Sequence, residues 1–121
     1  MTWEKEIIDY SLSCMPEEAC GLLAKVNQTI RFYKCQNYAV DKINNFMIGV
    51  DDWMRIEDQA QIVGIVHSHP NSKAELSEPD KKNCIGLDYP YYVVSCLDKN
   101  FKVFYPKDLK WCLQKLLFTV N

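Results

Sequence analysis

The 121-residue sequence lacks several features that would place it in a familiar class of protein. Its formal net charge is only -2, and no stripe of lysine and arginine is available to neutralise phosphates, which argues against nucleic-acid binding. No apolar run approaches the length of a membrane span, so no membrane partner is expected. Residues 1–6 have neither the basic nor the apolar region of a signal peptide, and we therefore predict a cytoplasmic protein.

Cysteine pairs with the CxxC spacing are absent as well, which argues against a cysteine-rich zinc site. Six cysteines are nevertheless present, scattered at positions 14, 20, 35, 84, 96 and 112. A reducing cytoplasm keeps such thiols reduced, and free cysteine usually behaves as a small buried hydrophobe. We expect that role here, including for Cys84, although Cys84 would lie about one turn beyond Asp80 on a predicted helix.

Motifs of other hydrolase classes are missing or incomplete. A zinc deaminase needs HxE and PCxxC, and the sequence contains neither. A metallo-β-lactamase-like hydrolase needs HxHxDH, but Asn71 and Ser72 occupy the last two positions. A cysteine peptidase that pairs a thiol with one of the histidines stays possible, yet it leaves their spacing unexplained.

What the sequence does contain is one short stretch that holds both of its histidines. The apolar residues 62–66 are typical of a buried strand, and the histidines follow at its end. Side chains two residues apart on a strand point to the same face, so His67 and His69 can direct two imidazoles at one ion. Catalytic zinc usually has three protein ligands and a water, and Asp80 is the nearest candidate for the third. Pro70 starts a polar loop that lets Asp80 fold back.

Residues 77–80 also match a helix-capping box, with Ser77 as N-cap and Asp80 at the third helical position. This structural interpretation is compatible with the metal site. A rigid helix start would hold Asp80 where a ligand is needed.

A chain of this length is expected to form one domain, spanning residues 1–121, with helices packed on a sheet. Apolar periodicity and turn residues predict the elements along the chain. Helices are expected at residues 2–13, from Asp51 or Asp52 to Ala60, at 77–86, and from Asp108 through Leu117. Strands are expected at residues 19–26, 29–35, 46–50, 62–66, 91–96 and 101–105, with hairpin turns at 27–28 and 98–100.

Two segments together resemble the signature of the JAMM (MPN+) metalloproteases. One is His67-Ser68-His69-Pro70 followed by Ser77 and Asp80, and the other is Pro-Glu-Glu-Ala-Cys-Gly-Leu-Leu at residues 16–23. The resemblance covers roughly residues 3–105, and no motif residue departs from the pattern. It implies an α/β fold, with a mixed sheet flanked by helices similar to the cytidine-deaminase-like fold, and a zinc-dependent peptidase or isopeptidase activity.

The same resemblance implies a role for each motif residue. One Zn2+ per chain would be bound by His67, His69 and Asp80. Glu18 would be the general base, and it is chosen over Glu17 because the family's glutamate lies three residues before the glycine. Ser77 would hydrogen-bond the developing oxyanion, a role that stays open beside its capping role.

Within the family, residues 37–39, 46–48 and 82–95 resemble the JAMM domain of lambdoid phage tail assembly proteins, in the prokaryotic and phage branch. The expected partner is a protein substrate, with the cleaved bond in an extended tail of a ubiquitin-like protein or of a phage tail protein. The expected location becomes the host cytoplasm if a phage encodes the chain. The alternative function is a non-catalytic MPN-type scaffold or interaction module, whose inactive relatives typically lack part of the metal set.

Overall fold

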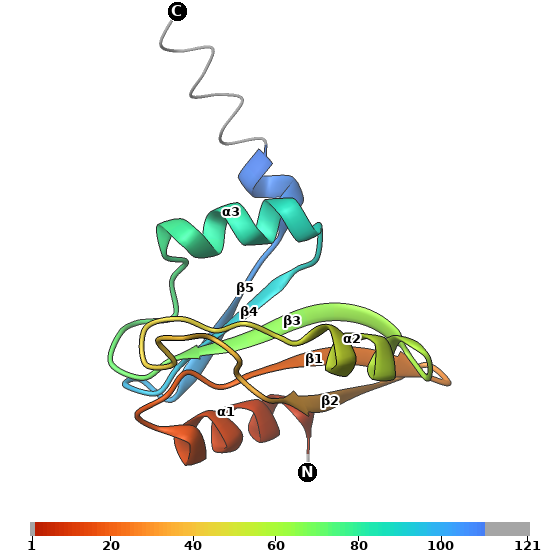
Figure 1. Cartoon of the computed structure of the whole chain (residues 1–121), viewed down its shortest axis with the longest axis horizontal. Coiled ribbons are helices and arrows are strands. Elements are labelled where there is room, and N and C mark those ends of the chain that lie inside the picture. The colour runs from red at the N-terminus through yellow and green to blue at the C-terminus, as the bar shows by residue number, and fades with distance from the viewer. Residues whose placement is uncertain (1, 111–121) are drawn as a thin grey trace, which may run out of the picture.

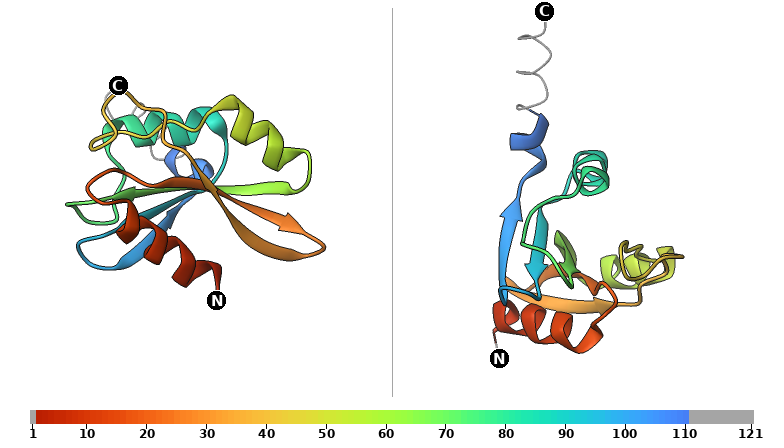
Figure 2. Two further views of the ribbon diagram at one scale, coloured as in Figure 1. Left: turned by 60° about the horizontal axis from the view of Figure 1, so that its bottom comes forward. Right: turned by 90° about the vertical axis from the view of Figure 1, so that its left-hand side faces the viewer.

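Five strands form one mixed sheet in the computed structural model, which describes residues 2–110 (Figure 1). The strands lie in the order β2-β1-β3-β4-β5. Their bounds are β1 Cys20–Val26, β2 Thr29–Cys35, β3 Gln61–His69, β4 Tyr91–Ser95 and β5 Asn100–Phe104. The helices are α1 Trp3–Cys14, α2 Val50–Glu57 and α3 Glu78–Leu87. Helix α1 covers one face of the sheet and the other two lie on the opposite face, which confirms the predicted α/β class (Figure 2).

The connections between strands explain the mixture of directions. Hairpins join β1 to β2 and β4 to β5, so both pairs are antiparallel. Strand β3 lies antiparallel beside β1 and parallel to β4, and the parallel pairing needs the crossover that α3 supplies. The first hairpin turns at Asn27 and Gln28, as predicted, and both residues have the positive φ that a two-residue hairpin turn requires.

The central strands are buried on both faces because helices cover both sides of the sheet. Along β1, Leu22 packs in a core with Ile56 of α2 and Cys84 of α3, whereas Leu23 packs in a second core with Ile7 of α1. Successive strand side chains point to opposite faces, so a continuous apolar run is what such a strand needs. Both histidines of β3 lie on the face toward α2 and α3, where aromatic residues of the first core pack against the ring of His67.

The predicted strand at residues 46–50 is wrong. Only Ile48 pairs, through an isolated bridge to Asn37, and Val50 already belongs to α2. The backbone N–H of Met47 is not available for a strand ladder, because it donates to the side-chain oxygen of Asn37 at 3.1 Å. A side chain thus replaces the partner strand that this apolar segment would need.

Helix α2 begins earlier than predicted, and its N-cap is Gly49 rather than Asp51 or Asp52. The carboxylate of Asp52 instead accepts hydrogen bonds from the backbone N–H of Gln36 and from Arg55, both at 3.2 Å. The helix ends at Glu57, before the predicted end at Ala60. Asp52 therefore ties α2 to the end of β2 and does not cap the helix.

Strand β3 is longer than predicted, and both histidines lie within it. Its pairing with β4 continues to its last residue, where His69 lies opposite Ser95. Pairing with β4 fixes the backbone of both histidines, and the strand ends at His69, just before Pro70.

Helix α1 begins and ends within one residue of its predicted bounds, and β2 matches its prediction. The start of the last predicted helix lies within the described residues, and residues 106–110 are helical. Its remaining predicted core positions, Cys112, Leu113, Leu116 and Leu117, lie outside the described residues.

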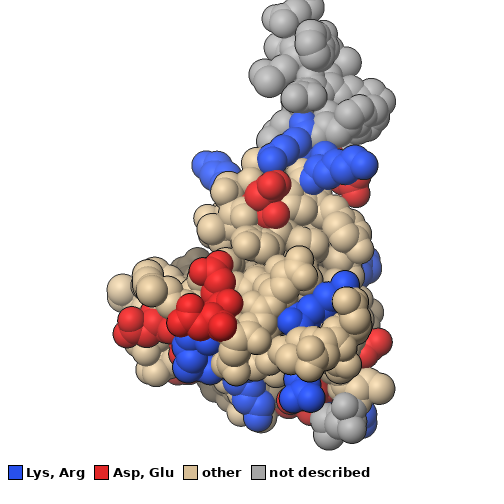
Figure 3. Space-filling view, turned by 90° about the vertical axis from the view of Figure 1, so that its right-hand side faces the viewer, with Lys and Arg blue, Asp and Glu red and all other residues tan. Residues whose placement is uncertain are grey.

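The cysteines among residues 2–110 are free thiols, and all but the half-buried Cys14 are buried, as predicted. The thiol of Cys84 donates to the carbonyl oxygen of Tyr89 at 3.5 Å, which agrees with a packing role. Within the same residues, no helix combines the length and the apolar character that crossing a bilayer requires. On the face seen in Figure 3, acidic and basic side chains form small separate groups.

Two glycines give a test of how tightly the sheet is packed. A Cβ atom at Gly21 in β1 would lie 2.5 Å from the carbonyl oxygen of Tyr33 and against the ring of Phe32, whereas a Cβ at Gly86 in α3 would meet nothing within 4 Å. We expect Gly21→Ala to lower the free energy of unfolding by about 2 kcal/mol or more, since the clash is with backbone. Gly86→Ala should raise it by roughly 0.5–1 kcal/mol, because alanine is the better helix former.

Chemical denaturation of the two variants and the wild type measures both effects. Equal stability of Gly21→Ala and the wild type would show that β1 and β2 can separate without cost.

Candidate metal centre

Both histidine rings project from the end of β3 toward the same side of the sheet. Their centroids lie 5.1 Å apart, and the ring of His67 is fully buried. Phe46 stacks on the His67 ring with centroids 4.4 Å apart, and Tyr91 packs edge-on against it at 5.4 Å. The rotamer of His67 is therefore held by aromatic packing on two sides.

The Nδ1 atoms of the two histidine rings differ in their hydrogen bonds. His69 Nδ1 lies 3.2 Å from the carbonyl oxygen of Lys73 and donates to it, so Nε2 is the nitrogen that can bind a metal once it loses the proton that it shares with Asp80. His67 Nδ1 is buried and has no hydrogen-bond partner among residues 2–110. The orientation of His67 thus depends on packing, while that of His69 depends on a backbone hydrogen bond.

Asp80 meets both histidines through one atom. Its Oδ2 lies 3.0 Å from His67 Nε2 and 3.1 Å from His69 Nε2. The same oxygen accepts the backbone N–H of Ser77 at 3.1 Å, while Ser77 Oγ accepts the backbone N–H of Asp80 at 3.2 Å. This is the predicted capping box at the start of α3, and it fixes the carboxylate against the histidines.

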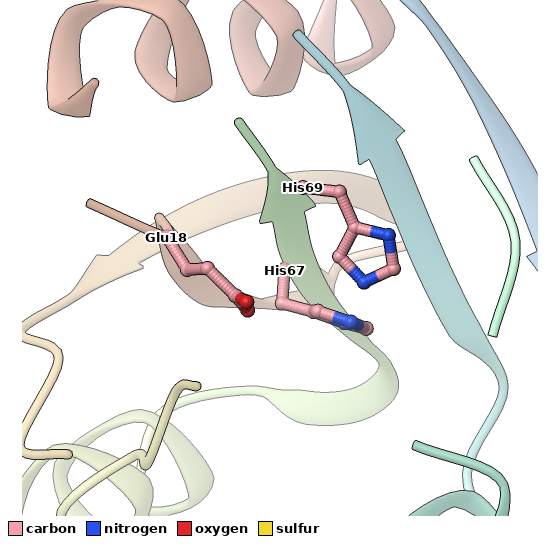
Figure 4. A group of neighbouring side chains, drawn as sticks. All are labelled: Glu18, His67 and His69. Carbon is pink, nitrogen blue, oxygen red and sulfur yellow. The ribbon is translucent and has the colours of Figure 1, made fainter. Parts of the chain in front are cut away.

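Glu18 reaches the site from the residue pair that precedes β1. Cys20 of β1 lies opposite His67, and the Ser68 N–H donates to the Ala19 carbonyl oxygen at 3.0 Å, so the antiparallel register continues toward the site. Extending that register by one more pair brings Glu18 beside His69 on the same face. Figure 4 shows the carboxylate of Glu18 directed toward the two rings. Glu18, His67 and His69 each offer a ligand atom, and these atoms lie within 4.8 Å of one another.

The arrangement fits a small cation. In tetrahedral zinc sites with nitrogen and oxygen ligands, bond lengths of about 2.0–2.2 Å place the ligand atoms roughly 3.3 Å apart. The separations of 3.0 and 3.1 Å between Asp80 Oδ2 and the two Nε2 atoms are close to that value. Two imidazoles, a buried carboxylate and a second carboxylate nearby are the donors that zinc accepts, so the residues present could hold such an ion.

Burial and hydrogen bonding shift the pKa values of the ionisable groups of the site in different directions. Burial opposes ionisation of Asp80, but hydrogen bonds from His67 and His69 hold the pKa of its carboxyl well below its usual range. Burial lowers the pKa of His67, and the hydrogen bond to Asp80 raises the pKa of His69. For Glu18, which is 7% exposed, burial raises the pKa to about 7, partly offset by the nearby His69. Glu18 is therefore the carboxyl that exchanges a proton near neutral pH.

An open groove of about 280 Å³ gives access to these groups. Its lining includes Glu18, His69 and Ser77, together with Ile43 and Asn44 of the loop between β2 and α2. Ser77 thus lies at the groove as well as capping α3, and because its Oγ accepts the Asp80 N–H, its own hydroxyl proton stays free to donate.

Ser68, between the two histidines, points to the opposite face and is fully buried. Its Oγ accepts the backbone N–H of Ala19 at 2.7 Å. Ser68 therefore has a structural role, since this hydrogen bond joins β3 to the residue after Glu18.

Two contributors to the site were not predicted. Phe46 was assigned to a strand, but it stacks on His67. Asn37 lies in a segment predicted to be irregular, yet its buried side chain bonds the carbonyl oxygen of Glu18 at 3.0 Å. Both residues lie in segments that resemble the phage JAMM domain, but neither the apolar run that begins at Phe46 nor the loop position of Asn37 indicates these contacts.

A model of the prokaryotic homologs of the JAB domain, the Prok-JAB family, matches residues 2–107. The chain belongs to this family. Tail tip assembly protein K of Escherichia phage N15 is 29% identical over 101 residues, which cover 84% of this chain and 42% of that protein. Tail tip assembly protein K of Escherichia phage lambda is 41% identical over 44 residues, or 36% of this chain and 22% of that protein. This Prok-JAB chain thus spans less than half the length of these relatives.

Solved structures share the fold. A JAB1/MPN domain protein from Archaeoglobus fulgidus superposes with a TM-score of 0.59 at 21% identity, over 85% of this chain and 82% of that one. A protein from Desulfitobacterium hafniense, solved in solution, gives a TM-score of 0.66 at 22% identity, over 85% and 79% of the two chains. The fold of this Prok-JAB chain is therefore that of JAB1/MPN domains.

The raised pKa of Glu18 predicts a pH-dependent cost in the metal-free protein. Between its ordinary value of 4.5 and about 7, the native state holds a proton that the unfolded state has lost, so Glu18 makes stability fall as pH rises through this range. Glu18→Gln removes the titration. We expect the variant to gain on the order of 1–3 kcal/mol over the wild type at pH 8, and much less at pH 4.5.

Denaturant titrations of both proteins in a metal chelator at the two pH values measure this difference. Groups distant from Glu18 cancel between the two proteins, whereas His69 does not cancel fully because the charge of Glu18 helps to raise its pKa. A stability difference that does not change between pH 4.5 and pH 8 would contradict the proposed state of Glu18.

Proposed function

We propose that this chain is a zinc-dependent JAMM-type metallopeptidase or isopeptidase that hydrolyses a peptide or isopeptide bond. The observation that carries the proposal is the position of Glu18, whose buried carboxylate faces a converging histidine–histidine–aspartate set at an open groove. A group that exchanges a proton near neutral pH is suited to general acid–base catalysis at that place.

In this proposal His67, His69 and Asp80 hold one Zn2+. When bound, zinc would supply Lewis acidity and lower the pKa of a water to about 7. Glu18 accepts the proton of the attacking water and passes it to the leaving amine. The free hydroxyl proton of Ser77 donates to the developing oxyanion, an interaction commonly worth about 3 kcal/mol.

The proposed substrate is a protein with an extended tail, which an open groove receives more readily than a folded surface. Two classes of tail are candidates, those of ubiquitin-like proteins and those of phage tail proteins. The named relatives are phage tail tip assembly proteins, which supports the second class. For that class the proposed location is the host cytoplasm.

A non-catalytic MPN-type interaction module is the second candidate function. The observation that favours it is that Asp80 Oδ2 already lies within hydrogen-bonding distance of both histidine Nε2 atoms, so these two nitrogens have a partner without an ion. Metal content and turnover separate the two candidates.

The first test is the metal content of protein purified without added metal or chelator. We expect about one zinc per chain in the wild type and in Glu18→Gln, because the proposed ligands are intact in both. The double variant His67→Ala and His69→Ala should hold none. Elemental analysis of folded protein measures this, and a folded wild type that stays empty after zinc is supplied would favour the interaction module.

The second test compares two neighbouring glutamates. Glu17 is exposed and Glu18 is buried at the site, so Glu17→Gln is a matched control for Glu18→Gln. Isopeptide-linked diubiquitin and a purified phage tail tip protein serve as probes. We expect Glu18→Gln to lower kcat by about 100-fold or more, the usual contribution of a general base, and Glu17→Gln to leave it unchanged. Full turnover by Glu18→Gln would remove Glu18 from the mechanism.

A further inference from the structure

The side-chain amide of Asn37 is a buried hub next to the site. It follows β2, is 9% exposed, and bonds only backbone groups. Its Nδ2 donates to the carbonyl oxygens of Glu18 at 3.0 Å, Asn45 at 3.0 Å and Lys42 at 3.5 Å. Its Oδ1 accepts the backbone N–H groups of Ala39 at 2.9 Å and Met47 at 3.1 Å.

These contacts use the whole bonding capacity of an amide. Two N–H protons serve three carbonyl oxygens, so one is shared, and the two lone pairs of Oδ1 are both occupied. Aspartate keeps the acceptor half but has no donor, and it would place a negative charge against three carbonyl oxygens. Asparagine is thus the side chain of this size that satisfies both halves.

The main target of the hub is the backbone of Glu18, which lies outside the β1 ladder. The Glu18 carbonyl oxygen accepts from Asn37, and the Glu18 N–H donates to the Lys42 carbonyl oxygen at 2.7 Å. Lys42 is itself one of the residues that Asn37 binds. Both backbone polar groups of Glu18 are therefore held by the segment of residues 37–47, and Asn37 closes that segment on itself.

The same segment contacts the metal-binding side of the site. Phe46, between the Asn45 and Met47 groups that Asn37 bonds, stacks on His67. Ile43 and Asn44 line the groove beside Glu18. A displacement of the segment would therefore move Glu18 relative to the two histidines while leaving the histidine strand in its sheet.

We propose that Asn37 is a positioning residue for Glu18: its amide locks residues 37–47 onto the Glu18 backbone and so aims the carboxylate into the groove. This inference rests on the proposed hydrolase function for its kinetic consequence only. Misplacing a catalytic group by about 1 Å commonly costs on the order of 100-fold in rate.

The test uses Asn37→Asp, with Asn45→Asp as the matched control. Asn45 lies on the same segment and is exposed, and its side chain makes no hydrogen bond within residues 2–110. Asn37 bonds only its backbone carbonyl oxygen, so the substitution adds the same charge and keeps every hydrogen-bonding group of the hub. Diubiquitin or the phage tail tip protein is the probe, whichever the wild type cleaves. Zinc content and backbone amide exchange are measured on the same samples.

We expect Asn37→Asp to retain about one zinc and to lower kcat at least tenfold, with KM changed less than about threefold. In a Glu18→Gln background the same substitution should cost less than about threefold more, because the two residues act as one unit. The Glu18 and Met47 amides should exchange faster in Asn37→Asp and stay protected in Asn45→Asp. Wild-type kcat in folded Asn37→Asp, or an additive loss in the double variant, would overturn the proposal.

Amide exchange keeps the inference separate from the proposed function. A wild type that cleaves neither probe refutes the hydrolase proposal, yet unchanged exchange at Glu18 in Asn37→Asp would still refute the positioning role. If Asn37→Asp does not fold, the wild type decides: Glu18 and Met47 amides that exchange as fast as exposed loop amides would show that the hub does not hold the segment.

Discussion

One carboxylate oxygen, Asp80 Oδ2, joins the end of β3 to the start of α3. It accepts hydrogen bonds from both histidine Nε2 atoms and from the Ser77 N–H, all between 3.0 and 3.1 Å. The atom that stabilises the first turn of α3 is therefore the atom that lies between the two rings. Because the helix N-terminus favours negative charge and the histidines do too, Asp80 stays ionised although it is 6% exposed. Helix start and candidate metal site cannot be separated here.

The surrounding fold supplies apolar cores and hydrogen-bond partners around these polar groups. Strands β1 and β3 are apolar on both faces and carry two cores, one with α1 and one with α2 and α3. The site lies at the end of these strands, where the ladder gives way to loops. There, buried polar side chains bond the backbone groups that no strand satisfies: Ser68 holds Ala19, and Asn37 holds Glu18. Burial opposes the charge of Glu18 and raises its pKa to about 7, whereas the hydrogen bonds of Asp80 outweigh the same effect.

Local pattern was enough to predict that the side chains of one strand end and one helix start lie together. His67 and His69 have the strand period of two, and Ser77 and Asp80 have the capping-box spacing, so each pair is encoded within a few residues. Errors occurred where a distant side chain replaces local structure. Residues 46–50 have the apolar character of a strand, but Asn37 takes the Met47 N–H, and Asp52 bonds Gln36 in place of capping α2. No periodicity records such contacts.

The position of Glu18 shows most clearly what local sequence pattern cannot predict. It lies 49 residues before His67 in the sequence, and only the pairing of β1 with β3 brings the two together. A carboxylate just before a strand has no local feature that separates it from a solvated one, so the sequence could assign Glu18 only through a family motif. The structure supplies the physical reason: in an antiparallel pair, residues two before Cys20 and two after His67 share a face, and Glu18 and His69 occupy those positions. The pairing of β1 with β3 thus brings Glu18 to the site. Loop residues 37–47 then bury it, because they satisfy the backbone groups before β1 that no strand bonds.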